Sequence, residues 1–149
     1  MATAAPVRHL IPEDREVWES LFRAYHAFYE VTVPDAVYPS TWSRLLSQDP
    51  GTHVGFVALG TDEVPIGLAH ALFHQSTWVE TGHVYLQDLF VDPHARGHGA
   101  GRALIEAVYA YADGLGAART YWLTHESNAT ARVLYDRVAT ESGFIQYRR

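Results

Sequence analysis

The sequence predicts a single α/β domain built on one mixed sheet, and three observations support this. Short runs rich in β-branched and aromatic residues alternate with stretches whose apolar residues recur every three or four positions. Extended runs in the first half follow one another across short turns, which favours antiparallel pairing there. The length of 149 residues suits one domain with its own core, and we expect that domain to span residues 1–149.

The sequence pattern in the first third of the chain predicts one strand and two helices. Residues 7–11 are a short apolar run and form the expected first strand. Residues 12–14 combine proline with two acidic residues, as at a helix N-terminus, and apolar residues across 17–29 then share one face. Residues 33–35 end this helix, and Ser40 is a candidate N-cap for a short second helix.

The remaining chain alternates between extended and helical patterns. Two extended runs flank a turn at 60–63 and predict a hairpin. An amphipathic run directly follows a glycine-rich stretch, and Gly114 and Gly116 end it. The expected order is strand 53–59, strand 65–74, strand 82–91, a helix with an apolar face from 100 to 111, strand 118–124, helix 128–138 and strand 143–147.

Composition excludes several classes of function. The net charge of -6 argues against general nucleic-acid binding, which depends on many Lys and Arg contacts to phosphate. The sequence contains no run of about 18 apolar residues, so no membrane span is predicted. Cysteine is absent, which excludes disulfides and a cysteine nucleophile and makes a cytoplasmic setting the simplest expectation. The nine histidines are scattered without metal-ligand spacing, so no metal site is expected.

The segment 88–102 carries the clearest chemical signal. An extended run leads into a loop with Gly97, Gly99 and Gly101, and a helix begins directly afterwards. Glycine lets the backbone approach a ligand closely, and the free amides of a helix N-terminus attract anions. The segment therefore predicts a ligand that carries phosphates, although a plain strand-to-helix turn is the alternative. Its glycine spacing fits neither a nucleotide-hydrolysing P-loop nor a dinucleotide fingerprint.

Three motifs resemble the GNAT superfamily of N-acetyltransferases. Arg96, Gly99 and Gly101 match the family's R-x-x-G-x-G pyrophosphate loop. The run from Asn128 through Ala131 and Leu134 to Tyr135 matches N-x-x-A-x-x-L-Y, and 143–144 match the terminal G-F. Within the superfamily, 85–91 are similar to a strand of the diamine (spermidine/spermine) acetyltransferases. Residues 121–128 look more like the fungal histone/polyamine and D-amino-acid acetyltransferase group.

The resemblance implies a fold and a co-substrate. The fold would be a central mixed sheet of six to seven strands flanked by four helices, and the co-substrate would be acetyl-CoA, with no metal. The residues that would bind it are Leu89, Phe90, Val91, Arg96, Gly97, His98, Gly99, Ala100, Gly101, Arg102, Asn128, Ala131 and Tyr135.

The resemblance also implies two catalytic residues. Tyr135 matches the family tyrosine that donates a proton to the departing thiolate, although helical spacing alone would make it a core aromatic. Asp88 is the candidate base, or a binding group for the substrate ammonium, or simply a carboxylate bonded to backbone. Gln87 stands where the diamine enzymes have glutamate, and an amide cannot accept this proton. The alternatives for the base are Glu30, Glu126, His74, His125 and a solvent relay.

The expected reaction is direct attack of a small primary amine, such as a polyamine or an amino acid, on acetyl-CoA in a ternary complex. Two alternatives stay open: acetylation of protein lysines or N-termini, and a non-catalytic acyl-CoA sensor. The last strand, apolar and then basic, suggests a homodimer, as in the fungal group, or an edge protected by its arginines. The expected acceptor-pocket residues are Tyr29, Glu30, His74, Trp78, Gln87 and Asp88.

Overall fold

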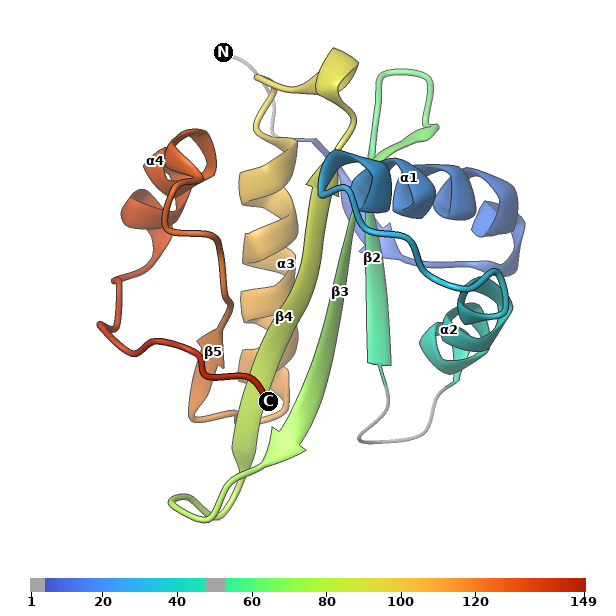
Figure 1. The fold of residues 1–149 in the computed structure, drawn as a ribbon. Helices are drawn as coiled ribbons and strands as arrows, with labels where there is room; N and C mark the ends of the chain where they lie inside the picture. The colour runs from blue at the N-terminus through green and yellow to red at the C-terminus, as the bar shows by residue number, and fades with distance from the viewer. Residues whose placement is uncertain (1–4, 48–52) are drawn as a thin grey trace.

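One mixed sheet of five strands organises the molecule, as the computed structural model shows for residues 5–47 and 53–149 (Figure 1). The strands lie in the order β1-β2-β3-β4-β5, and only the β4–β5 pair is parallel. The predicted mixed α/β class is confirmed, whereas the expected six to seven strands are too many. The strands are β1 Val7–His9, β2 His53–Leu59, β3 Pro65–Gln75, β4 Gly82–Val91 and β5 Arg119–Tyr121.

Four α-helices cover the sheet on both faces (Figure 1). Helices α1 and α2 pack on one face, α3 packs on the other, and α4 lies beside α3. The Tyr109 hydroxyl of α3 donates to the Val138 carbonyl at 2.7 Å and so holds the end of α4. The helices are α1 Arg15–Phe28, α2 Val37–Leu46, α3 Ala100–Gly114 and α4 Ala129–Val138, with short 3-10 turns at Pro12–Asp14 and Pro93–Ala95.

The sheet separates two apolar clusters. On the α1 side, Trp18 is 0% exposed and packs with Phe22, Leu68 and Phe90. On the α3 side, buried residues of β2, β3 and β4 pack against one face of α3. Burial of these apolar surfaces on both faces is the main driving force for folding.

A β-bulge in β4 changes which side chains face which cluster. His70 of β3 pairs with Asp88, and Ala71 pairs with Leu86, so Gln87 is an extra residue. Before the bulge the even-numbered residues, such as Leu86, pack on the α3 side. After it, Leu89 packs there and Phe90 packs on the α1 side. Because side chains alternate along a strand, the same shift places Asp88 on the α1 face.

The structure corrects three sequence predictions. Ser40 lies inside α2, whose N-cap is Ala36, since residues 34–38 already form the first turn through backbone hydrogen bonds. Strand β5 covers only three of the expected seven residues, 118–124, because the chain bends away after Tyr121. The expected strand at 143–147 does not form, since no neighbouring strand of the described chain lies beside it and Phe144 is 90% exposed.

Two further observations concern membranes and metals. In residues 5–47 and 53–149, every helix is too short or too polar to cross a bilayer. Within the same ranges, no three His, Asp or Glu side chains gather into a group able to hold a metal ion.

Truncation of Leu104 tests the α3-side core. Leu104 is 0% exposed, so Leu104→Ala removes buried methyl groups and leaves a cavity. We expect the free energy of unfolding in urea to fall by about 3 kcal/mol. Leu115→Ala is the matched control, because Leu115 is 44% exposed, and it should cost less than about 1 kcal/mol. Equal losses in the two variants would contradict this description of the core.

Candidate active site

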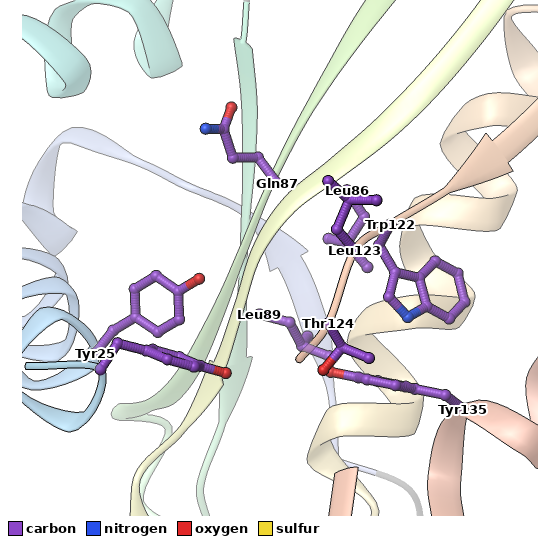
Figure 2. A pocket seen from close by; sticks show the side chains of 9 residues that line it. Tyr25, Leu86, Gln87, Leu89, Trp122, Leu123, Thr124 and Tyr135 are labelled. Atoms are coloured by element: carbon purple, nitrogen blue, oxygen red, sulfur yellow. The ribbon is translucent and has the colours of Figure 1, made fainter. Parts of the chain in front are cut away.

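A pocket opens where α1, β4, α4 and the segment after β5 meet (Figure 2). It holds about 290 Å³ of space, part of which is open to solvent. Tyr25 from α1 and Tyr135 from α4 point into it from opposite sides. The lining residues are Tyr25, Tyr29, Leu86, Gln87, Leu89, Trp122, Leu123, Thr124 and Tyr135.

The pocket exists because β4 and β5 diverge. Their parallel pairing ends at Tyr85 and Tyr121, whereas β4 continues to Val91. Over that last part, β4 pairs with β3 on one edge and has no strand on its other edge within the described residues. Backbone N–H and C=O groups at an unpaired edge remain available to a ligand. The edge from Leu86 onward can therefore bind an extended polar chain.

Tyr135 brings a protonated hydroxyl to the pocket. Its ring packs edge-on against Trp122, with 5.4 Å between ring centroids. Burial, together with the nearby Tyr29 hydroxyl, raises the pKa of Tyr135 to about 12. The hydroxyl therefore keeps its proton at neutral pH and can act as a donor.

Two tyrosines at the end of α1 form the opposite wall. Tyr25 and Tyr29 are four residues apart, so they lie on the same face of the helix and pack edge to face at 5.0 Å. Burial raises the pKa of Tyr25 well above its usual range, and the charge of Asp88 adds to this effect. Tyr25 thus connects the pocket to Asp88.

Asp88 lies just behind the pocket wall and does not line the pocket. His70 Nδ1 is 2.9 Å from Asp88 Oδ2, and the Asp88 side chain is 17% exposed. On the far side of the ring, Trp18 Nε1 is 2.8 Å from His70 Nε2. The carboxylate is therefore connected to the buried core of the α1 face.

The glycine-rich turn before α3 lies beyond the C-terminal end of β4. Gly97 and Gly99 have φ of 89° and 77°, a left-handed conformation that favours glycine. Within the described residues, a Cβ built at either position would meet no heavy atom within 4 Å. Within the part of the chain that the structure describes, no side chain caps the N-terminus of α3 at Gly99, and the first amides of a helix have no partner inside the helix. An anion can bind to such a turn.

Arg96 turns away from the glycine turn. Its Nε donates to the Val91 carbonyl at 3.0 Å, and its guanidinium lies 5.4 Å from the Phe28 ring. Arg96 therefore joins the end of β4 to the end of α1. Arg102, in the first turn of α3, pairs with Glu106 at 3.0 Å.

The structure brings some predicted site residues together and separates others. Tyr29, Gln87, Leu89 and Tyr135 line the pocket. Trp78 is 88% exposed in the loop between β3 and β4 and lies outside the lining. The other predicted residues outside the lining are Glu30 after α1; His74 of β3, bonded to Tyr121; Phe90 and Val91 at the end of β4; residues 96–102 of the glycine turn and the start of α3; Asn128 and Ala131 of the α4 region; and His125 and Glu126 of the β5–α4 loop.

Sequence reasoning missed Tyr25, His70, Leu86 and the lining residues 122–124 as site residues. The four-residue spacing of Tyr25 and Tyr29 is a signal that could have marked Tyr25, although it also fits an ordinary packed face. His70 had no such signal, because its contact with Asp88 depends on the bulge.

Comparisons with known proteins identify the family of this chain. Residues 18–139 match the Acetyltransferase (GNAT) family. The D-amino-acid N-acetyltransferase HPA3 of Saccharomyces cerevisiae is 37% identical over 145 residues, which cover 96% of this chain and 89% of HPA3. The uncharacterized N-acetyltransferase YhfO of Bacillus subtilis is 33% identical over 69% of this chain and 62% of its own.

A solved structure shows the same fold. AAC(6')-Iy, in complex with the bisubstrate analogue CoA-S-monomethyl-acetylneamine, superposes with a TM-score of 0.83. The match covers 99% of this chain and 98% of the other, at 21% identity, and so concerns the fold alone. Because the family match spans 18–139 and HPA3 is 37% identical over nearly the whole chain, the protein belongs to the GNAT family and is an acetyltransferase.

Proposed function

We propose that this protein transfers the acetyl group of acetyl-CoA to the primary amine of a small molecule. The observation that carries the proposal is the pocket at the β4–β5 divergence, where the Tyr135 hydroxyl points in opposite Tyr25 (Figure 2). Both the glycine turn and the free edge of β4 adjoin the end of this strand, so a phosphate-bearing chain could run from one to the other.

The residues of the glycine turn fit a pyrophosphate. Gly97 and Gly99 leave open space where other residues would have side chains, and the α3 amides add a positive dipole end. The free edge of β4 fits an amide-containing arm, which would extend the sheet pairing. The residues we assign to binding are Leu89, Phe90, Val91, Arg96, Gly97, His98, Gly99, Ala100, Gly101, Arg102, Asn128, Ala131 and Tyr135.

The proposed chemistry needs one proton donor and one proton acceptor. Acetyl-CoA supplies an acetyl group activated as a thioester. Tyr135 holds its proton at neutral pH and gives it to the departing sulfur. Asp88 receives the proton that the amine loses. Because Tyr25 lines the pocket and Asp88 does not, we place the Tyr25 hydroxyl between the amine and the carboxylate.

For the acceptor, we propose an amino acid in preference to other amines. The relative with 37% identity is described as a D-amino-acid N-acetyltransferase. The Tyr25 and Tyr29 rings face the pocket, and aromatic faces attract an ammonium group. Gln87, at the bulge, presents an amide that can donate to a carboxylate and accept from an ammonium.

A thiol-release assay with acetyl-CoA tests the reaction. We expect turnover with D-amino acids in a panel that includes L-amino acids, polyamines, aminoglycosides and histone peptides. Tyr135→Phe should lower kcat by about 100-fold, because the proton donor is lost. Tyr111→Phe, on α3 away from the pocket, is the matched control and should keep the wild-type rate.

The other outcomes of this assay separate the alternatives. Turnover with peptides alone would favour a protein acetyltransferase. Tight binding of acetyl-CoA without turnover on any amine would favour a sensor and contradict the role of Tyr135.

Calorimetric titration with CoA tests the glycine turn. Gly99→Ala places a side chain on a left-handed residue at the turn, so we expect the Kd for CoA to rise by about tenfold. Gly114→Ala is the matched control, since Gly114 has no positive φ and open space around it, and it should leave the Kd unchanged. An unchanged Kd in Gly99→Ala would argue against this cradle.

We also propose that the C-terminal segment joins two copies of the chain. Phe144, Ile145 and Tyr147 are 90%, 76% and 89% exposed, and a second copy would bury them. Light scattering should give twice the mass of one chain, and removal of 143–149 should give the single mass. Replacement of Arg148 and Arg149 by glutamine keeps the apolar residues and should keep the dimer. A monomeric wild type would contradict this part of the proposal.

A further inference from the structure

A row of three hydrogen-bonded side chains crosses the α1 side of the sheet. Trp18 of α1, His70 of β3 and Asp88 of β4 are joined by contacts of 2.8 and 2.9 Å. Trp18 is 0% exposed and His70 is 2% exposed. Buried polar side chains that pair with one another in this way are fixed in position.

The direction of each hydrogen bond follows from the chemistry of the groups. The Trp18 indole nitrogen can only donate, so His70 Nε2 must accept. The single ring proton then lies on Nδ1, which donates to Asp88 Oδ2. Trp18 therefore selects one tautomer of His70, and that tautomer points a donor at the carboxylate.

The surroundings of Asp88 make this donor important. The titratable side chains that interact electrostatically with Asp88 are Tyr25 and His26 from α1, His53 from β2, His70 from β3 and Tyr85 from β4. Tyr25 lines the pocket and also interacts with Asp88. His70 approaches from the sheet and binds one oxygen, which orients the carboxylate as a whole.

We infer that His70 and Trp18 are positioning residues that fix the orientation of the Asp88 carboxylate and aim it at the pocket through Tyr25. The inference rests on the proposed function. In the proton transfer, the amine N–H bond breaks and its proton joins the Tyr25 oxygen, while the Tyr25 proton moves to Asp88. One proton thus passes from the amine to the carboxylate, and His70 keeps its own proton throughout.

The tautomer can be tested without any activity. In protein labelled with ¹⁵N-histidine, the His70 signals are those that disappear in His70→Gln. We expect them to show the Nδ1–H tautomer alone. Trp18→Phe keeps the aromatic ring and removes the N–H donor, so the second tautomer should appear there. The Nε2–H tautomer in the wild-type protein would overturn the inference.

Two variants of His70 separate positioning from folding. The amide nitrogen of asparagine is one bond from Cγ, as Nδ1 is in histidine, so His70→Asn keeps a donor for Asp88. The terminal amide of glutamine corresponds to Nε2, so His70→Gln keeps a partner for Trp18 and loses the donor. Each variant loses one hydrogen bond, and we expect similar decreases in Tm.

The kinetic effects should differ. His70→Gln should lower kcat by about tenfold, because the hydrogen bond that orients the Asp88 carboxylate is lost. His70→Asn should stay within about twofold of wild type, and KM for acetyl-CoA should not change in either. Equal losses of kcat that follow Tm would overturn the inference. If the wild type acetylates no amine, the proposed function fails, and the tautomer experiment alone decides whether Asp88 is held in this way.

Discussion

The extra residue Gln87 in β4 is the constraint on which the rest of the site depends. If Leu86, Gln87 and Asp88 followed one another in a regular strand without the bulge, side-chain alternation would place Asp88 on the same side as Leu86, against the apolar surface of α3. An ionised carboxylate there would be buried without a partner, which is strongly destabilising. With the bulge, Asp88 faces α1 and meets His70 and Tyr25. The bulge also leaves Gln87 at the pocket wall.

The second constraint is the short pairing between β4 and β5. A longer parallel ladder would close the free edge of β4 and fill the space that Tyr135 and Trp122 now line. The chain after Tyr121 instead bends into α4, which the Tyr109 contact with Val138 holds beside α3. The packing of α4 against α3 thus keeps the chain after Tyr121 away from the free edge of β4, and the pocket stays open.

Sequence reasoning succeeded where one periodic pattern covers a whole element. Apolar periodicity and the positions of the glycines predicted the limits of β2 and β4. They also predicted the helix after the glycine turn and the helix after Asn128. The sequence also predicted four of the pocket residues, either from family motifs or from the expected order of the helices and strands. These are Tyr29, Gln87, Leu89 and Tyr135.

The failures have physical reasons. The apolar pattern of a strand does not indicate where a bulge occurs, so the contact of His70 with Asp88 could not be predicted from the sequence. Residues 122–124 look extended, and their departure from the sheet depends on the packing of α4. Residues 143–147 have the composition of a strand, but a strand needs a neighbour, and the described residues of one chain offer none. Ser40 resembles a cap, but the backbone bonds of residues 34–38 start the helix earlier.

The attachment of α4 to α3 divides the site into two halves. The glycine turn begins α3, and the same helix holds the end of the helix that carries Tyr135. The glycine turn and Tyr135, both assigned to the acetyl donor, therefore share one rigid support. The groups assigned to the amine come from α1, β3 and the bulge, on the other face of the sheet. Substitutions on α1 can therefore alter the choice of amine during evolution while the machinery for the donor stays intact.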